Sequence, residues 1–263
     1  MPAAKKPSSS PAVSKIRLDR LLVEKSLTEN RHKAQAAIMA GLVTIDGKRV
    51  DKAGALVNPS ANVSIAGPAI PFVGRGGLKL AAALDHFALD VRGQTFLDIG
   101  SSTGGFVDCL LQRGATRVHA VDVGSGQLDW RLRQDPRVHL LEGVNARYLA
   151  WELIGEVVDG ISVDVSFISV TMILPRLVQF CRTGTRLLVL VKPQFEVGKG
   201  QVGKGGVVRD PQKHEQSVAH VRDCAAKLGF QDLQDFPCPV LGAAGNQEFF
   251  VTGVFSGTGA PAN

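Results

Sequence analysis

The sequence TFLDIGSSTGGF at residues 95–106 decides the fold. An apolar run at 95–99 enters a glycine-rich turn, after which a helix is expected to begin. Such a turn lets a ligand approach the backbone closely. Further strand-like runs alternate with helix-like stretches, at 118–123, 138–141, 159–165, 187–191 and 249–255. This alternation predicts an α/β fold with a parallel, doubly wound sheet, in which ligands bind at the carboxyl ends of the strands.

The glycine turn predicts a cofactor site that differs from the site for NAD. Its spacing is G-x-x-x-G-G, so the G-x-G-x-x-G fingerprint of pyrophosphate binding is absent. Asp122 ends the second strand, where an acidic side chain can accept hydrogen bonds from a ribose diol. The alternative is a generic doubly wound turn, with Asp98 and Asp122 acting only as helix caps.

Four ionisable residues occupy positions where charge is costly. Lys79 falls in a helix expected after Gly74, whereas Asp164, Lys192 and Glu248 lie directly at the ends of apolar strand-like runs. A charge at such a place is unfavourable unless it is paired or used. Two acids and two bases can form two structural salt bridges, and that is the alternative to a catalytic cluster.

The basic residues concentrate near the N-terminus. Residues 1–75 hold 12 Lys and Arg against 5 Asp and Glu, which leaves 18 against 19 for the rest. A basic module joined to a near-neutral one suits a phosphate-backbone partner, although a solvated lysine-rich surface is the alternative. An amphipathic helix begins at residue 17, and a second helix is capped by Thr28 or Asn30 and ended by Gly41. A hairpin with an Asp46-Gly47 turn follows.

Composition disfavours several other classes of protein. No apolar run reaches the roughly 18 residues that a membrane span needs, and residues 1–14 read as a flexible tail rather than a signal peptide. The four cysteines form no C-x-x-C pair and the six histidines show no ligand spacing. We therefore expect no metal site and a reducing, cytoplasmic location.

The helix, helix and hairpin resemble the small RNA-binding fold named after ribosomal protein S-four. The matching motifs are Arg17-Leu18-Asp19, Arg31-x-x-Ala34, Gly41-x-Val43 and Asp46-Gly47-Lys48. The resemblance implies that six basic side chains lie on one face, where about half would contact RNA phosphates without reading sequence. These side chains are Arg17, Arg20, Arg31, Lys33, Lys48 and Arg49.

Asp98-x-Gly100 together with Asp122 is similar to the cofactor site of class I S-adenosylmethionine methyltransferases. The resemblance implies that Asp98 lies near the methionine amine, Gly100 and Gly104 lie under the cofactor, Asp122 binds the ribose and Asn145 lies near the adenine. The full predicted site comprises Asp98, Gly100, Ser101, Ser102, Thr103, Gly104, Gly105, Phe106, Asp122, Asn145 and Asp164.

The order Lys79, Asp164, Lys192, Glu248 matches the tetrad of the FtsJ-like ribose 2′-O-methyltransferases. The ribose hydroxyl is the poor reactant in such a transfer, so catalysis requires a base that removes its proton. We expect a neutral Lys192 to be that base, Lys79 to act electrostatically, and the two carboxylates to orient the lysines. With the N-terminal module, residues 15–255 resemble the TlyA family, which methylates cytidine riboses in ribosomal RNA. The supporting motifs include 163–169, VDVSFIS, and 191–196, VKPQFE.

The resemblance implies a Rossmann-like class I methyltransferase sheet, mostly parallel with an antiparallel last strand, and a small N-terminal α+β domain. The expected organisation is a tail at 1–14, an S-four-like domain at 15–66, a linker at 67–75, a methyltransferase domain at 76–256 and a tail at 257–263. The expected partners are ribosomal RNA or ribosomal subunits, and the oligomeric state is undetermined.

Several alternatives follow from individual motifs. Base methylation is disfavoured because Asp164 is followed by no Pro-Pro-aromatic run, and an NTPase is disfavoured because the near-Walker segment at 198–206 has Gly205 where Ser or Thr would bind magnesium. That segment is expected to be a mobile basic lid or RNA clamp. A membrane-damaging, haemolysin-like protein and a catalytically inactive RNA-binding scaffold stay open.

Overall fold

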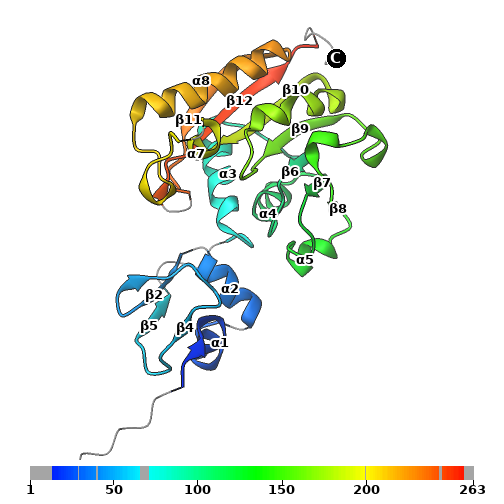
Figure 1. Cartoon of the computed structure of the whole chain (residues 1–263). Coiled ribbons are helices and arrows are strands. Elements are labelled where there is room, and N and C mark those ends of the chain that lie inside the picture. The colour runs from blue at the N-terminus through cyan, green and yellow to red at the C-terminus, as the bar shows by residue number, and fades with distance from the viewer. Residues whose placement is uncertain are drawn as a thin grey trace, which may run out of the picture. The chain divides into compact units, whose positions relative to one another are not determined.

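The computed structural model describes residues 14–28, 30–39, 41–65, 71–198, 200–242 and 245–257 (Figure 1). The chain divides into two compact units between Ile70 and Pro71. Most of both predicted tails and residues 67–70 of the predicted linker lie outside the described residues.

The first unit contains two helices and two small sheets. Its elements are β1 (Ile16–Arg17), α1 (Leu18–Glu24), α2 (Arg31–Met39), β2 (Val43–Ile45), β3 (Lys48–Arg49), β4 (Leu56–Val57) and β5 (Val63–Ile65). One sheet pairs β1 with β4, and the other has the order β3-β2-β5. The core between helices and strands consists of Leu18, Leu21, Leu22, Ala34, Ile38, Val43 and Val63.

The helix and hairpin predictions for this unit are confirmed. Asn30, rather than Thr28, caps α2, because its Oδ1 accepts a hydrogen bond from Lys33 N at 2.9 Å. Asp46 and Gly47 both have positive φ, at 49° and 77°, as a type I′ hairpin turn requires. The strands β4 and β5 were not predicted, since runs of two and three residues carry too little periodicity to be recognised.

The second unit is built on a seven-stranded sheet of order β11-β12-β10-β9-β6-β7-β8. Its strands are β6 (Thr95–Ile99), β7 (Arg117–Asp122), β8 (Val138–Glu142), β9 (Val158–Val163), β10 (Cys181–Val191), β11 (Phe230–Pro237) and β12 (Phe249–Phe255). The neighbours from β10 through β9, β6 and β7 to β8 run parallel, whereas β12 runs antiparallel to both β10 and β11. The predicted mostly parallel sheet with an antiparallel last strand is confirmed.

Helices cover both faces of this sheet (Figure 1). The α-helices are α3 (Arg75–His86), α4 (Gly105–Gln112), α5 (Trp130–Arg133), α6 (Leu174–Leu177), α7 (Pro193–Glu196) and α8 (Pro211–Lys227). Single 3₁₀ turns are η1 (Ala146–Tyr148), η2 (Trp151–Leu153), η3 (Val170–Met172), η4 (Val178–Phe180) and η5 (Lys204–Gly206). Along β6, Leu97 and Ile99 pack with α6 and α8, and Phe96 packs on the other face with α3 and α4. This alternation of side chains gives the sheet two apolar cores.

A glycine contact joins the starts of α3 and α4. A Cβ added at Gly105 would lie 2.8 Å from Gly77 N, so this approach requires glycine. The contact sets α3, which carries Lys79, against the helix that follows the glycine turn.

Candidate active site

Four charged residues meet at the carboxyl edge of the parallel strands. Asp164 follows β9, and Lys192 follows the neighbouring strand β10. Glu248 precedes β12, whose first residue Phe249 pairs with Val191, so Glu248 reaches the same edge from an antiparallel strand. Lys79 arrives from α3 and places its Nζ 2.5 Å from Glu248 Oε2, while Lys192 Nζ lies 2.6 Å from Asp164 Oδ1. The structure therefore brings together all four residues of the predicted tetrad, Lys79, Asp164, Lys192 and Glu248.

The two ion pairs differ in exposure. The side chains of Lys79 and Glu248 are 10% and 2% exposed, whereas those of Lys192 and Asp164 are 11% and 21% exposed. Burial raises the pKa of the Cys238 thiol, and Lys79, Glu248 and Asp164 all act on it electrostatically. Members of both pairs thus lie near Cys238, and the Lys192–Asp164 pair is the more exposed of the two.

Asp98 is a buried carboxylate that is only half satisfied. Its side chain is fully buried, and its Oδ1 accepts a hydrogen bond from Ser162 Oγ at 2.5 Å. Among the described residues, no group donates a hydrogen bond to its Oδ2 or pairs with the buried Ser101 Oγ. Burial raises the pKa of Asp98 to about 7; the Ser162 bond opposes this rise, and the charges of Asp164 and Asp122 add to it. A cationic ligand would relieve this arrangement.

Asp122 shapes the glycine turn. Its Oδ2 accepts from Ser102 N and its Oδ1 from Gly124 N, both at 2.7 Å. Gly100 has φ +87°, and a Cβ there would lie 2.3 Å from the carbonyl oxygen of Asp164. The turn therefore approaches the end of β9 so closely that only glycine fits at this position.

Three other predicted cofactor residues have structural contacts. Asn145 is exposed, and its Oδ1 caps η1 by accepting from Arg147 N at 3.1 Å. Phe106 is buried, with its ring 6.1 Å from that of Phe250. The carbonyl of Thr103 accepts from Asp129 N at 3.2 Å.

The predicted RNA-binding residues are partly engaged in ion pairs. Arg17 and Arg31 both donate to the fully buried Asp19, at 2.9 and 3.0 Å, and Arg20 pairs with Glu24 at 3.2 Å. The Arg17 guanidinium beside Asp19 holds the pKa of that carboxyl well below its usual range. Asp19 thus fixes two of the six basic side chains. Lys48 and Arg49 are exposed on β3.

Further side chains lie at the tetrad edge that were not among the predicted site residues. Ser166 Oγ accepts from Lys192 Nζ at 3.0 Å. Phe167 is 91% exposed with φ 66°, and its ring lies 5.1 Å from that of Phe195. Ser166 and Phe167 both belong to the motif at 163–169. That motif does not indicate that the Phe167 side chain is exposed; the structure shows this, together with the positive φ of Phe167.

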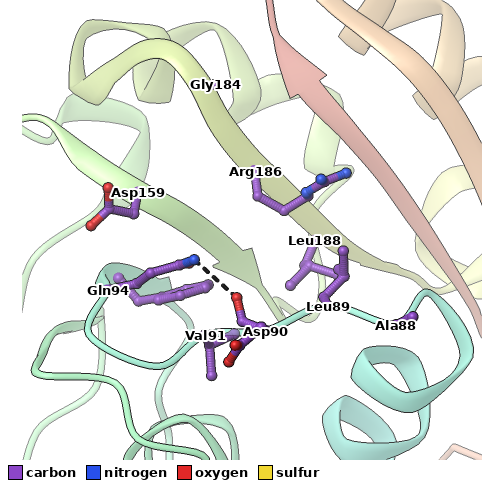
Figure 2. Close-up of a pocket in the computed structure, with 10 residues that line it drawn as sticks. Ala88, Leu89, Asp90, Val91, Gln94, Asp159, Gly184, Arg186 and Leu188 are labelled. Atoms are coloured by element: carbon purple, nitrogen blue, oxygen red, sulfur yellow. Dashed lines mark hydrogen bonds between the residues drawn. The ribbon is translucent and has the colours of Figure 1, made fainter.

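A cavity of about 260 Å³ lies at the opposite edge of the sheet. Asp90, Gln94 and Asp159 line it near the amino ends of β6 and β9, with Leu188 of β10 (Figure 2). Gln94 Nε2 donates to the carbonyl oxygen of Asp90 at 2.9 Å. This cavity is separate from the tetrad, because the strands run between the two edges.

Two kinds of feature are absent from the part of the chain that the structure describes. No group of three or more His, Cys, Asp or Glu side chains there is arranged to hold a metal ion. No helix in the same part of the chain has the length and apolar character to cross a membrane.

The doubly wound sheet, with its glycine turn beside a Lys-Asp-Lys-Glu cluster, defines a Rossmann-like class I methyltransferase. The chain belongs to the TlyA family of FtsJ-like methyltransferases: the FtsJ-like methyltransferase family matches residues 72–255, and an S4 domain matches residues 16–63. The predicted family, fold class and enzyme class are thereby confirmed.

Named relatives carry two kinds of description. The 16S/23S rRNA (cytidine-2′-O)-methyltransferase TlyA of Mycobacterium tuberculosis is 47% identical over 236 residues, which cover 89% of this chain and 88% of that protein. Hemolysin A of Brachyspira hyodysenteriae is 38% identical over 239 residues, covering 89% and 98%. A solved structure of a hemolysin-named protein from Streptococcus thermophilus has a TM-score of 0.74 at 40% identity, covering 94% of this chain and 91% of that one.

Proposed function

We propose that this chain transfers a methyl group from S-adenosylmethionine to the 2′-hydroxyl of a cytidine in ribosomal RNA, in the cytoplasm. The observation that carries the proposal is the meeting of the Lys79–Glu248 and Lys192–Asp164 pairs at the carboxyl edge, next to the glycine turn. The printed activity of the Mycobacterium tuberculosis relative supports the substrate. Mass mapping of ribosomal RNA from a strain lacking this protein tests it: at least one cytidine 2′-O-methyl group should disappear, and an unchanged map would reject the function.

The residues around the turn fit S-adenosylmethionine. The half-satisfied Asp98 carboxylate and the buried Ser101 hydroxyl suit its amine. The two oxygens of Asp122 already accept backbone N–H groups, but a carboxylate has further lone pairs that could accept from the ribose diol. Gly100 and Gly104, which hold the turn in conformations with positive φ, would lie beneath it, and Asn145 would lie near the adenine. When bound, the cofactor supplies a methyl carbon on a sulfonium with an excellent leaving group. The remaining chemistry falls on the side chains of the chain.

Those side chains would act on the ribose hydroxyl. Lys192 Nζ would accept the proton of the 2′-hydroxyl, so that O2′ could receive the methyl group that the cofactor would supply, with the sulfonium sulfur as the leaving group. Asp164 orients Nζ, with Ser166 as a second partner. The more deeply buried Lys79–Glu248 pair supplies fixed charge behind them.

Two other candidate functions have separate tests. A membrane-damaging protein would cause leakage of liposomes that does not depend on Asp98 or Lys192, and Hemolysin A gives the reason to test it. An inactive RNA-binding scaffold would bind RNA but give no heat with S-adenosylmethionine in calorimetry.

The exposed Phe167 ring is the first target for a substrate-side variant. RNA bases stack on exposed aromatic side chains, and stacking of one base contributes about 1–3 kcal/mol. We expect Phe167→Ala to lower kcat/KM for ribosomal subunits about tenfold or more while the dissociation constant for S-adenosylmethionine stays unchanged. Phe167→Trp, which keeps a stacking face, should retain most activity. An unchanged kcat/KM in Phe167→Ala would contradict a base contact.

The N-terminal unit is proposed to bind RNA phosphates through Arg17, Arg20, Arg31, Lys33, Lys48 and Arg49. The double variant Lys48→Ala/Arg49→Ala should weaken RNA binding and lower the slope of log K against log salt by about 2, because each phosphate contact contributes about 1. Filter binding over a range of salt measures both quantities. Lys227→Ala, at an exposed site on α8, is the control. An unchanged slope would remove β3 from the RNA interface.

A further inference from the structure

Glu196 links two segments at the carboxyl edge of the sheet, residues 165–170 and α7, through hydrogen bonds. It is the last residue of α7, and its Oε2 accepts from Ser169 Oγ at 2.6 Å while its Oε1 accepts from Val170 N at 3.0 Å. Each oxygen of one carboxylate therefore holds a different donor of the segment that follows Asp164.

Both fastened segments lead directly from reacting groups. Residues 165–170 follow Asp164, and α7 begins immediately after Lys192, whose carbonyl accepts from Phe195 N at 2.8 Å. Lys192 Nζ contacts Asp164 and Ser166 across the same gap. Glu196 therefore provides a polar link between the two segments that does not involve Lys192. The Phe167 and Phe195 rings provide an apolar contact between the same segments.

The 3₁₀ turn η3 does not need the Glu196 carboxylate as its N-terminal cap. Ser169 already caps η3 with its own side chain, which accepts from Thr171 N at 3.3 Å. Burial raises the pKa of Glu196, so its charge is held against a desolvation cost by the Ser169 and Val170 donors. Such a link stabilises one relative placement of the two segments.

We propose that Glu196 is a positioning residue for methyl transfer, which sets the placement of Asp164 relative to Lys192 and the direction of the Phe167 ring. This inference rests on the proposed function of the tetrad. Glu196 acts through Ser169 and Val170 on the segment that Asp164 begins. It therefore acts mainly on the rate of the chemical step, because its effect reaches the predicted cofactor residues only through the placement of Asp164.

Glu196→Gln is the direct test, because glutamine keeps the length of the side chain but offers one oxygen to two donors. The assay uses labelled S-adenosylmethionine and ribosomal subunits from a strain that lacks this protein. We expect kcat to fall at least about tenfold, since small misplacements of reacting groups are costly. The KM for subunits, the dissociation constant for S-adenosylmethionine and the melting temperature should stay close to those of the wild type. Glu215→Gln, at an exposed glutamate of α8, is the matched control.

Ser169 provides the second half of the test. Ser169→Ala, which removes the Ser169–Glu196 bond and leaves the Val170–Glu196 bond, should also lower kcat. The double variant Glu196→Gln/Ser169→Ala should lose less than the two single losses combined, because the two changes affect one shared bond. Ser169→Thr keeps the hydroxyl and should keep activity. Additive losses, or full activity in both single variants, would overturn the proposal. If Glu196→Gln does not fold, the comparison of Ser169→Ala with Ser169→Thr decides the question.

Hydrogen exchange distinguishes this inference from the function on which it rests. In Glu196→Gln the amides of 165–170 should exchange faster than in the wild type, without any turnover. Unchanged exchange there would overturn the proposal. Suppose that the wild-type chain methylates no ribosomal RNA, but that the amides of 165–170 exchange faster in Glu196→Gln. The proposed function would then be rejected, whereas the structural link made by Glu196 would be supported.

Discussion

Lys192→Ala should lower the rate of methyl transfer by about 10²–10⁴, the range expected for the loss of a general base. Lys192 Nζ contacts Asp164 and Ser166, and of these two only Asp164 is also a predicted cofactor residue, so the dissociation constant for S-adenosylmethionine should change far less than the rate. Single-turnover assays with ribosomal subunits measure the rate, and calorimetry measures cofactor binding.

Lys192→Arg separates a base from a fixed charge. Arginine keeps the positive charge beside Asp164 but does not lose its proton in proteins. A base at this position therefore predicts an inactive Lys192→Arg, whereas a purely electrostatic role predicts an active one. Full activity in Lys192→Ala would exclude both roles for this lysine.

Asp98→Asn should weaken the binding of S-adenosylmethionine by about one to two orders of magnitude, because a hydrogen bond to a charged group contributes about 1.5–3 kcal/mol. Asparagine retains an oxygen for Ser162 Oγ, so the fold should be preserved. Ser162→Ala, which removes that bond and keeps the carboxylate, should weaken cofactor binding less. Equal affinity in Asp98→Asn and the wild type would place the cofactor amine elsewhere.

The raised pKa of Asp98 also predicts a pH dependence. With a pKa of about 7, Asp98 of the unliganded protein gains a proton as the pH falls below 7. A cationic ligand favours the ionised form, so the dissociation constant should rise as the pH falls, by at most about tenfold per unit. In Asp98→Asn this dependence should vanish. For folding the sign is opposite to that of a salt-bridged aspartate: the folded state holds the proton longer, so this group's contribution to stability decreases as the pH rises from about 4 to 7.

Apolar strands with sharp boundaries were predictable, and polar ones were not. Both β6 and β12 occupy the residues that the sequence indicated, since each is rich in apolar residues and is bounded by polar or glycine-containing segments. Strand β10 begins six residues earlier than predicted, at Cys181, because its first half is polar and exposed. Strand β11 was missed because it is an edge strand with mostly exposed polar side chains, which leave no run of apolar residues.

The charges of the site were predictable, but their partners were not. A charge at the end of an apolar strand is conspicuous in a sequence, and this identified Asp164, Lys192 and Glu248. Which lysine meets which carboxylate depends on the placement of α3 against α4, and the glycine contact that sets it has no sequence periodicity. The left-handed backbone of Phe167 and the two hydrogen bonds of Glu196 are likewise tertiary features.

The position of β12 between β10 and β11 has a consequence for biosynthesis. A chain that is still attached to the ribosome can complete every parallel strand, its glycine turn and three of the four charged groups before Glu248 has emerged. Lys79 would then be a buried cation without its counterion, and the slot for the final strand would be open. Assembly of the charged cluster therefore depends on the insertion of β12 between β10 and β11, because that strand brings Glu248 to Lys79.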